Sequence, residues 1–338
     1  MKGNKKTILA VLFGQKPERI PVWLMRQAGR YLPEYRALRS KAGSFMKLCL
    51  TPELASEVTL QPVRRFGMDG AILFSDILIV PYGLGLKLDF VEGEGPKLEK
   101  LSSALPVFKP ESFLEKTAPI YGTVRQVASE MPENTTLIGF CGGPWTVACY
   151  MLGESKDQFQ AARNRDAGFL KELLDVLVEA SAVYLLQQIK AGAEVVQIFD
   201  SHAGLCPKEF YDDFVMKPAK RIIEKLRAEF PGFPIIGFPR QSPPENLPRY
   251  AKETGMTAVS LDTDADFVWA EKNIPAILQG NLDPKLLEGE AEPMLDAAEK
   301  ILKNAAKPFI FNLGHGLSPQ AKPQNVQALV EKIHSWRI

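Results

Sequence analysis

The sequence predicts an α/β fold: one (β/α)8 barrel of the TIM type over residues 1–338, with an N-terminal extension and insertions. Eight short apolar runs rich in β-branched residues recur along the chain, each followed by turn residues and a helical pattern. The runs are continuously apolar, which is typical of parallel strands buried on both faces. The length of 338 residues also fits such barrels, which commonly have roughly 200–400. A doubly wound open sheet is the alternative, but no Gly-x-Gly-x-x-Gly fingerprint follows the first run.

The strands are expected, in chain order, at residues 21–27, 70–76, 136–143, 193–201, 233–239, 258–263, 276–282 and 309–316. The first intervals between strand starts are long (49 and 66 residues) and later ones are short (25 and 18), so the insertions are expected in the N-terminal half. The apolar stretch 8–13 precedes the first strand and ends at Gly14. It is short and lacks a small-residue cleavage site, so we expect a short helix and not a signal peptide.

Amphipathic helices are expected between the strands. The clearest follows Asp166 and precedes Gly192, because apolar residues recur there with helical spacing at Leu170, Leu173, Leu174, Leu177 and Val178. Another is expected from Pro207, a favourable first helical residue, and it carries Phe210 and Phe214. Two more are expected to begin within 283–287 and 323–333.

The composition is that of a globular protein, with 46% hydrophobic and 24% charged residues, and it excludes disorder and coiled coils. Lys and Arg total 41 against 40 Asp and Glu, a net charge of +1. No global field therefore attracts nucleic acid or an anionic membrane, and anions must be recognised by local clusters. No apolar run approaches the roughly 18–20 residues that span a bilayer.

The four cysteines, Cys49, Cys141, Cys149 and Cys206, form no disulfide framework and no Cys-x-x-Cys pair. A closed zinc site is therefore not expected. Reduced thiols in a cytoplasmic protein are the simplest interpretation.

Arginines gather after the first expected strand. Arg26, Arg30, Arg36 and Arg39 lie within fourteen residues, with Glu34 as the only acid. In a barrel the active site forms at the carboxyl ends of the strands, and arginine suits the bidentate capture of carboxylate or phosphate. Arg26 and Arg30, which flank the tight turn Gln27-Ala28-Gly29, are therefore candidates for anion binding. For Arg36 a solvated helix face is an equal alternative.

Other polar residues follow other strands. Asp76 is either a site carboxylate or a cap for the next segment, and Tyr150, beyond the turn Gly142-Gly143-Pro144, is either a site residue or ordinary packing. Two of the three histidines, His202 after Ser201 and His315 in a Gly-His-Gly turn, stand at strand ends. That glycine turn could instead cradle a phosphate. The third, His334, is expected at the surface. P-loop, Gly-x-Ser-x-Gly and His-Glu-x-x-His motifs are absent.

Five segments resemble the uroporphyrinogen decarboxylase family. PVWLMRQAGRYLPEYR (21–36) and GFCGGPWTVACYM (139–151) resemble its two signature stretches, and FSDIL (74–78), FDSHAG (199–204) and NLGHG (312–316) resemble three further blocks in the same order. The resemblance implies a single-domain barrel, typically a homodimer without metal or organic cofactor. It also implies a carboxy-lyase of haem and chlorophyll synthesis that converts the four acetates of uroporphyrinogen III to methyls, giving coproporphyrinogen III and four CO2.

The resemblance also assigns roles. It implies that Asp76 and Arg26 are catalytic and that Gln27, Ala28, Gly29 and Arg30 complete a substrate-binding turn. Tyr150, Ser201 and His315 would contact the substrate, and Arg39 matches a further family arginine. Asp200 departs from the glutamate that family members often carry there. The chemistry fits, because protonating a pyrrole carbon creates an electron sink within the substrate itself. Asp76 should then be ionised, which neighbouring guanidinium charges favour.

Two other functions are compatible with such a fold. A zinc-dependent methyltransferase of the same superfamily would need a His-x-Cys pair and a distant cysteine, which residues 237–241 do not offer. His202 and Cys206 are four apart but adjoin a different block. A non-catalytic tetrapyrrole carrier would not need Asp76 together with the arginines. For the enzyme, we expect Arg26, Asp76, Tyr150, Ser201 and His315 to converge at one end of the barrel.

Overall fold

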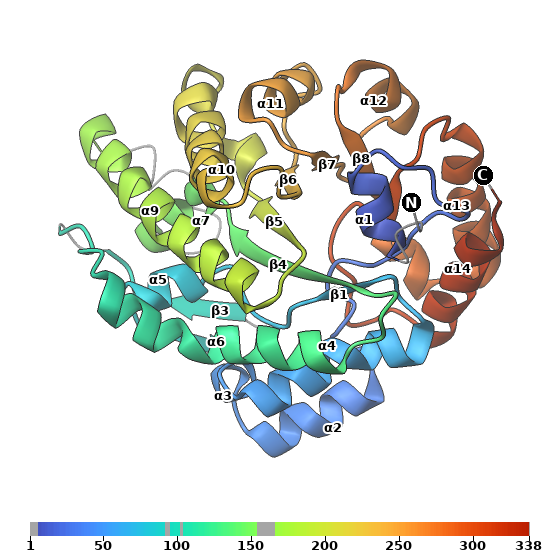
Figure 1. Ribbon diagram of the computed structural model, residues 1–338, viewed down its shortest axis with the longest axis horizontal. Helices are drawn as coiled ribbons and strands as arrows, with labels where there is room; N and C mark the ends of the chain where they lie inside the picture. The colour runs from blue at the N-terminus through green and yellow to red at the C-terminus, as the bar shows by residue number, and fades with distance from the viewer. Residues whose placement is uncertain (1–5, 92–94, 102–103, 154–165, 338) are drawn as a thin grey trace.

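A computed structural model describes residues 6–91, 95–101, 104–153 and 166–337. Its main sheet is parallel, and consecutive strands are neighbours in the order β1-β4-β5-β6-β7-β8-β9. The strands are β1 (Gly70–Ile72), β4 (Thr136–Gly142), β5 (Val195–Asp200), β6 (Ile235–Pro239), β7 (Ala258–Ser260), β8 (Ile277–Leu282) and β9 (Ile310–Leu313). Seven of the eight expected strands are confirmed, and the sheet curls with helices outside it (Figure 1).

The first expected strand, 21–27, is wrong in its extent. Only a bridge between Val22 and Phe311 forms, yet it joins the two edges of the sheet. The Phe311 N–H donates to the Pro21 carbonyl (2.9 Å) and the Asp69 N–H to the Val22 carbonyl (2.9 Å). The chain cannot continue as a strand because it turns at Arg26, whose φ is +59°. This short segment therefore closes the barrel between β9 and β1.

Helices alternate with the strands, as expected for β/α units. They are α1 (Thr7–Leu12), α2 (Pro33–Ala42), α3 (Phe45–Cys49), α4 (Pro52–Phe66), α5 (Ile79–Gly83), α6 (Pro110–Glu130), α7 (Pro144–Leu152), α9 (Ala167–Ala191), α10 (Lys217–Glu229), α11 (Asn246–Thr254), α12 (Phe267–Asn273), α13 (Ala291–Asn304) and α14 (Pro323–Ser335). The long early intervals hold α2 to α4, and then α5, α6 and an antiparallel hairpin, β2 (Leu88–Val91) with β3 (Gly95–Leu98), which the sequence did not predict.

The helix after Asp166 is confirmed. The Asp166 carboxylate accepts the Gly168 N–H (3.1 Å) at the start of α9, and Gly192, with φ +121°, ends it. The helix expected from Pro207 is confirmed, with Pro207 as its N-cap. A 3-10 helix at Lys208–Phe210 and a π-helix at Asp212–Met216 lead without a break into α10. This segment stacks Phe214 on both Phe210 and Trp145, with ring centroids 5.2 and 5.6 Å apart. The helix at 283–287 is a 3-10 turn, Pro284–Glu288, and α14 is confirmed.

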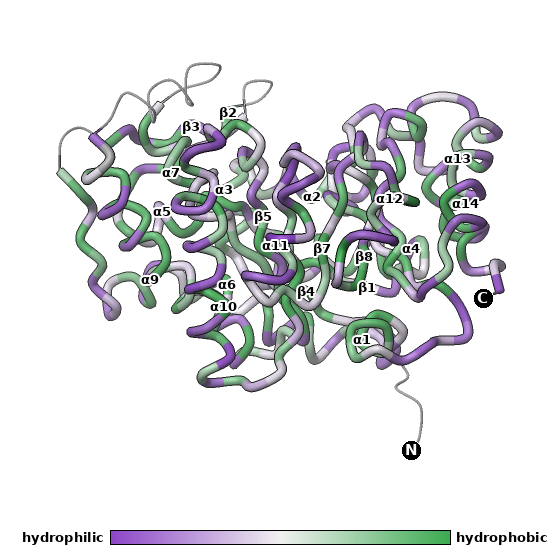
Figure 2. Tube along the Cα trace, turned by 90° about the horizontal axis from the view of Figure 1, so that it is seen from above, coloured by the Kyte–Doolittle hydropathy of each residue, from purple (hydrophilic) through white to green (hydrophobic). Residues whose placement is uncertain are grey.

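Helix α1 covers the amino ends of the strands, which we call the floor of the barrel. Its residues Ile8, Val11 and Leu12 belong to one buried cluster with residues from the strands, including Ile138, Val195, Ile236 and Ile310. In Figure 2 α1 lies at one end of the molecule and the β2–β3 hairpin at the other. We call the carboxyl ends of the strands the mouth.

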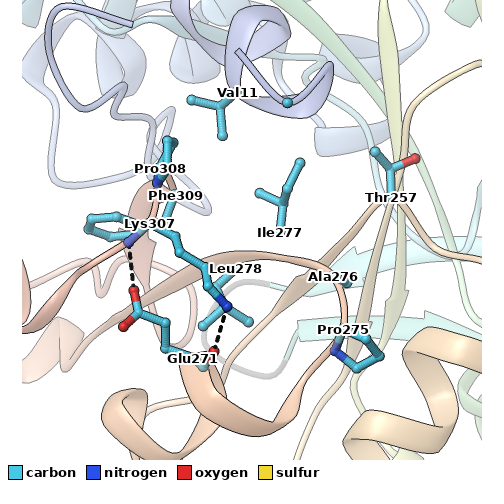
Figure 3. Close-up of a pocket in the computed structure, with 11 residues that line it drawn as sticks. Val11, Thr257, Glu271, Pro275, Ala276, Ile277, Leu278, Lys307, Pro308 and Phe309 are labelled. Atoms are coloured by element: carbon cyan, nitrogen blue, oxygen red, sulfur yellow. Dashed lines mark hydrogen bonds between the residues drawn. The ribbon is translucent and has the colours of Figure 1, made fainter. Parts of the chain in front are cut away.

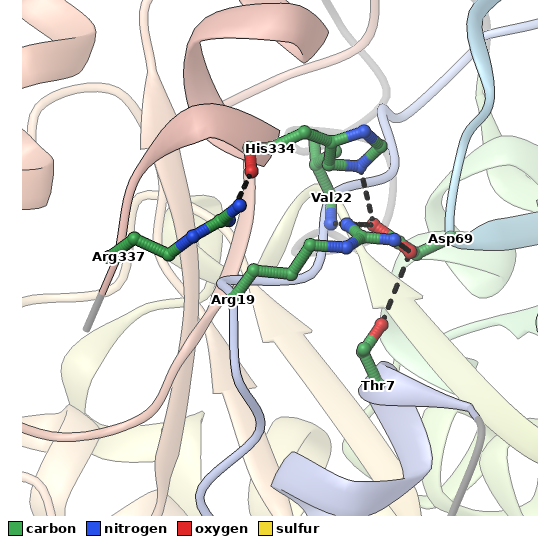
Figure 4. A network of polar contacts seen from close by, with 6 residues as sticks. All are labelled: Thr7, Arg19, Val22, Asp69, His334 and Arg337. Carbon is green, nitrogen blue, oxygen red and sulfur yellow. Dashed lines mark hydrogen bonds and ion pairs between the residues drawn. The ribbon is translucent and has the colours of Figure 1, made fainter.

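A buried carboxylate ties both chain ends to the floor (Figure 4). Asp69 accepts hydrogen bonds from Arg19 (2.6 and 2.9 Å), from the Val22 N–H (2.9 Å) and from Thr7 (3.2 Å), and His334 lies 3.0 Å away. Burial alone would raise the pKa of Asp69, but the hydrogen bonds from His334 and Arg19 and the Arg19 charge lower it. His334, which was expected at the surface, is half-buried there and pairs with a residue far away in the sequence.

Candidate active site

The chain turns sharply where the closing segment reaches the mouth. The Gln27 N–H donates to the Leu24 carbonyl (2.9 Å), and Arg26 takes a left-handed conformation that L residues other than glycine rarely adopt. A Cβ on Gly316 would lie 2.5 Å from the Arg26 Cδ, so glycine at 316 leaves room for the arginine side chain. The turn thus presents an exposed Arg26 guanidinium against the loop after β9.

Gln27 supports this turn from inside. Its side chain is fully buried, its Oε1 accepts the Leu24 N–H (3.1 Å) and its Nε2 donates to the Gly70 carbonyl (2.9 Å). Its backbone carbonyl accepts the Tyr31 hydroxyl (2.7 Å). With these groups engaged inside the protein, the Gln27 side chain holds the turn and does not face a ligand.

The other arginines of the cluster differ from one another. Arg36 Nη1 donates to the carbonyls of Arg30 (2.7 Å) and Tyr31 (3.3 Å), so it fixes the backbone of the turn. Arg30 is exposed and Arg39 is half-buried. Burial raises the pKa of Tyr35 while the charges of Arg39 and Arg30 oppose this, which places both near Tyr35. Ala28 and Gly29, between Arg26 and Arg30, are half-buried.

Asp76 follows β1 and is partly exposed at the mouth. One carboxylate oxygen accepts the Leu78 N–H (2.8 Å), and no other hydrogen bond to the carboxylate occurs among the described residues. Burial raises the pKa of Asp76, while the Leu78 hydrogen bond and then the Arg26 charge oppose this. The expected help from a guanidinium is present, but the net shift is upward. Asp76 therefore caps the next turn and also keeps an oxygen for a ligand.

Tyr150 lies on α7, half-buried beside the same charges. Burial raises its pKa, the Asp76 charge adds to this and the Arg26 charge opposes it. Its ring stacks on that of His202 with a centroid distance of 5.1 Å. Tyr150 therefore belongs to the mouth and carries a protonated hydroxyl at neutral pH.

The buried Asp200 carboxylate joins α7 to β5. It accepts hydrogen bonds from the Thr146 N–H (3.2 Å) and the Thr146 hydroxyl, and that hydroxyl also accepts the His202 N–H (2.9 Å). A Cβ on Gly143 would lie 2.5 Å from the Asp200 Cγ, so the glycine turn is what lets α7 approach. Burial raises the pKa of Asp200 to about 6, although the Thr146 hydrogen bonds oppose this. Asp200 thus positions the helix that carries Tyr150.

Ser201 and His202 follow Asp200, and both are half-buried. Burial and next the Arg240 charge lower the pKa of His202, so its ring is neutral at neutral pH. His202 Nδ1 is buried and has no hydrogen-bond partner among the described residues. No described side-chain contact engages Ser201, which leaves its hydroxyl available to a ligand.

His315, in the loop after β9, lies within the fields of two arginines. Burial lowers its pKa to about 4, and the charges of Arg240 and Arg26 add to this. His315 is therefore a neutral imidazole at physiological pH. Arg240 follows β6, where its N–H donates to the Asp200 carbonyl (3.1 Å). The sequence analysis missed Arg240, although it is the first residue after the strand expected at 233–239 and the strand-end rule would have found it.

The Arg26 charge acts on Asp76, Tyr150 and His315, which places these four residues near one another at the mouth. Ser201 is connected to these residues only through the adjacent His202, whose ring stacks on Tyr150. Arg30 and Arg39 have no described contact with Asp76. The arrangement combines guanidinium groups, one available carboxylate and neutral hydrogen-bonding groups. Such a surface suits a polycarboxylate on which positive charge develops.

A cavity of about 440 Å3 lies elsewhere, at the floor (Figure 3). Ile277 and Leu278 line it, together with Glu271 and Lys307, which are engaged with each other: Glu271 Oε1 accepts the Lys307 N–H (3.0 Å), and Lys307 Nζ donates to the Glu271 carbonyl (3.2 Å). No strand-end residue of the mouth lines it, so we do not place the chemistry there. Within the described ranges no three His, Cys, Asp or Glu side chains are grouped to hold a metal ion. No described helix is long and apolar enough to cross a membrane.

Comparison with known proteins gives one family over nearly the whole chain. A family model described as uroporphyrinogen decarboxylase matches residues 4–336. Uroporphyrinogen decarboxylases from Paracoccus denitrificans and Acidiphilium cryptum are each 48% identical, covering 98% of this chain and 99% and 94% of their own lengths. Among solved structures, a methyltransferase from Methanosarcina mazei superposes with a TM-score of 0.82 at 19% identity, covering 98% of both chains. At that identity the likeness supports the fold alone.

Proposed function

The chain belongs to the uroporphyrinogen decarboxylase family, and from that premise we propose how the mouth of its barrel carries out the reaction. The enzyme is a carboxy-lyase of tetrapyrrole synthesis that decarboxylates uroporphyrinogen. The reaction replaces the four acetates by methyls and releases four CO2. We propose that the whole chain, 1–338, works as one catalytic domain, which the family match over 4–336 supports.

The arginines of the turn bind substrate carboxylates. Uroporphyrinogen carries eight carboxylates, whereas this chain has a net charge of only +1, so attraction must be local. Arg26 and Arg30 are exposed, and neither guanidinium forms an ion pair or hydrogen bond among the described residues. Each is free to hold a carboxylate through its planar fork. Ala28 and Gly29 are small and leave room for the substrate beside the turn, and the buried Gln27 side chain holds the turn by its hydrogen bonds.

Asp76 accepts hydrogen bonds from the pyrrole N–H groups of a folded macrocycle. One of its oxygens is occupied by the Leu78 N–H, which fixes the carboxylate, while the other oxygen has no hydrogen bond among the described residues and is available to the substrate. As a ring carbon is protonated, positive charge spreads over the pyrrole, and an ionised Asp76 stabilises it. The resulting cation accepts the electron pair that the departing CO2 leaves behind, which gives an exocyclic methylene. Protonation of this methylene carbon gives the methyl group, and loss of the proton first added to the ring carbon restores the pyrrole.

Neutral donors complete the site. The Tyr150 hydroxyl stays protonated, since its pKa is raised, and the imidazole of His315 stays neutral, since its pKa is about 4. With Ser201 they offer hydrogen bonds to carboxylates without adding charge beside the developing cation. Arg26 supplies the nearest positive charge to Asp76 and balances it before the substrate arrives.

The observation that carries this proposal is the partly exposed Asp76 carboxylate, anchored on one side and placed in the field of Arg26. The test is an anaerobic assay that counts the carboxyl groups of the porphyrinogens formed from uroporphyrinogen III. Wild type should give the four-carboxyl product and CO2. A tetrapyrrole carrier would bind uroporphyrinogen and release no CO2. A zinc-dependent methyltransferase would neither bind uroporphyrinogen nor release CO2, and it would purify with bound metal.

We also propose that the chain forms a homodimer in the cytoplasm. The dimer is what the family resemblance implies, and light scattering coupled to gel filtration tests it, with a mass near 37.5 kDa contradicting it. The cytoplasmic location is supported by four free cysteines, all buried, whose thiols form no disulfide.

A further inference from the structure

Arg240 occupies the side of the mouth away from the arginine turn, and its backbone is held from several directions. Its N–H donates to the Asp200 carbonyl at the end of β5 (3.1 Å), and its carbonyl accepts the Gly204 N–H (3.0 Å). A Cβ on Gly204 would lie 2.1 Å from the Gln241 carbonyl oxygen, so only glycine permits this approach. The loops after β5 and β6 are therefore fastened together at Arg240.

The next residue fastens a third loop. Gln241 takes a left-handed conformation, with φ +56°, and its N–H donates to an Asp262 carboxylate oxygen (2.5 Å) after β7. A non-glycine residue adopts this conformation only where its surroundings compensate for the strain. Such fixed backbone on both sides is what a residue needs if its side chain is to meet a ligand in a defined position.

The Arg240 side chain, in contrast, has no hydrogen-bond or ion-pair partner in the part of the chain that the structure describes. It is half-buried, and among the described residues no carboxylate pairs with its guanidinium and no acceptor hydrogen-bonds to it. Arginines on the outer helices behave differently: Arg249, for example, pairs with Asp212 (2.8 Å) and Glu253 (3.1 Å). A partly desolvated guanidinium without an ion-pair partner is unfavourable unless a bound anion pairs with it.

The groups around Arg240 leave that position open to an anion. Asp262 already accepts the Gln241 N–H, and Asp200 is buried and engaged by Thr146. The two histidines within its field, His202 and His315, have lowered pKa values and are neutral, so they can donate a hydrogen bond to an anion. The charges of both Arg240 and Arg26 lower the pKa of His315, so the two arginines lie near the same imidazole.

We propose that Arg240 binds a carboxylate side chain of the substrate on the side of the mouth opposite Arg26. This inference rests on the proposed function, because a macrocycle with carboxylates around its whole edge is the ligand that two separated arginines can hold at once. The bound carboxylate belongs either to an acetate, which the reaction removes, or to a propionate, which the product keeps. Bidentate binding by Arg240 would fix how the macrocycle is rotated in the site, and therefore which acetate lies next to Asp76.

The test compares Arg240→Gln and Arg240→Lys with wild type in anaerobic steady-state kinetics and in equilibrium binding of coproporphyrinogen. Loss of a charge-assisted hydrogen bond weakens binding about 10–150-fold, so Arg240→Gln should raise the KM for uroporphyrinogen within that range. Lysine keeps the charge but loses the fork, and a smaller increase is expected. If the Kd of coproporphyrinogen rises by the same factor, the ligand is a propionate; if only the substrate is affected, it is an acetate.

Stability serves as the folding control. Because the Arg240 guanidinium has no described protein partner, its removal leaves no group unpaired, and the melting temperature should stay within a few degrees of wild type. If Arg240→Gln fails to fold, Arg240→Lys decides the question alone. The matched control is Arg249→Gln, an exposed arginine just beyond the same loop, which should leave KM and Kd unchanged.

Two failures can be told apart. If wild type does not decarboxylate uroporphyrinogen, the proposed function fails and this inference fails with it. If wild type is active while folded Arg240 variants keep normal KM, kcat and product Kd, the proposed function stands and the role of Arg240 is refuted.

Discussion

Gly316 and Arg26 lie so close that a methyl group on Gly316 would meet the arginine at 2.5 Å from Cδ and 2.8 Å from Cγ. The two residues come from opposite ends of the chain and meet because the closing segment pairs with β9. Gly316, the second glycine of the Gly-His-Gly turn, is therefore part of the arginine site.

Gly316→Ala should displace the Arg26 side chain. Because Arg26 is exposed and has no described ion pair, it can move without loss of a protein contact, and the melting temperature should change little. Misplacing a binding group by about 1 Å can reduce catalysis roughly 100-fold, and we expect kcat/KM to fall about 10–100-fold. Gly289→Ala, whose Cβ would meet only the Leu286 carbonyl at 3.9 Å, is the control. Wild-type kinetics in Gly316→Ala would show that the position of Arg26 is unimportant.

Arg26→Lys and Arg30→Lys test whether the planar fork matters beyond charge. Each variant keeps the positive charge but cannot hold a carboxylate with two parallel hydrogen bonds. We expect kcat/KM for uroporphyrinogen to fall about 10–150-fold, the range for one charge-assisted hydrogen bond. Arg36 donates to backbone carbonyls of the same turn, so Arg36→Lys should lower the melting temperature more than the other two. Normal turnover by both Arg26→Lys and Arg30→Lys would show that these arginines contribute surface charge and do not bind the substrate through the planar fork.

Asp200 should make stability depend on pH. Its folded pKa of about 6 lies above the usual 3.8, so the folded state binds the proton more tightly than the unfolded chain does. The resulting stabilisation is present at low pH and is lost as pH rises through about 6. Asp200→Asn removes this titration, and its free energy of unfolding relative to wild type should rise by about 3 kcal/mol between roughly pH 3 and 7. Urea unfolding at several pH values measures this, and a constant difference between the two proteins would contradict it.

The sequence predicted the barrel because continuous apolar runs mark strands buried on both faces, and seven such runs became strands. It could not predict where the first run stops, because the left-handed Arg26 depends on Gly316 and on Gln27 Nε2 bonding to Gly70. Periodicity also does not reveal that the helix expected from Pro207 begins with 3-10 and π-helical geometry before it becomes α-helical at Lys217.

For the site, strand-end position was the useful signal. It indicated Asp76, Tyr150 and His315, and Arg240 stands at the same kind of position, directly after the strand expected at 233–239. Strand-end position does not predict pairing between distant segments. His334 meets Asp69 only because the barrel closes, and the internal role of Gln27 follows from three-dimensional contacts that no local pattern encodes.

The last prediction concerns the ionised form of Asp76. Burial raises its pKa above the usual range, so a reaction that needs the carboxylate should lose kcat/KM as pH falls through that raised pKa, at a pH above the ordinary value for aspartate. Asp76→Asn keeps an oxygen for the Leu78 N–H and so should fold and bind some substrate. Without the charge it should lose turnover on the order of 100–1000-fold, as when one electrostatic stabiliser is removed, and the acidic limb of the pH profile should disappear from its residual activity.

Asp76→Glu keeps the charge one methylene further out and should retain partial activity with the acidic limb intact. Asp296→Asn, an exposed change on the outer helix α13, is the matched control and should leave both kcat and the pH profile as in wild type. The comparison separates two roles of Asp76, because its hydrogen bond to the Leu78 N–H survives in the asparagine variant whereas stabilisation of a pyrrole cation does not. If Asp76→Asn turned over like wild type, the residue would only cap the turn after β1, and the pyrrole cation would have to be stabilised by another group.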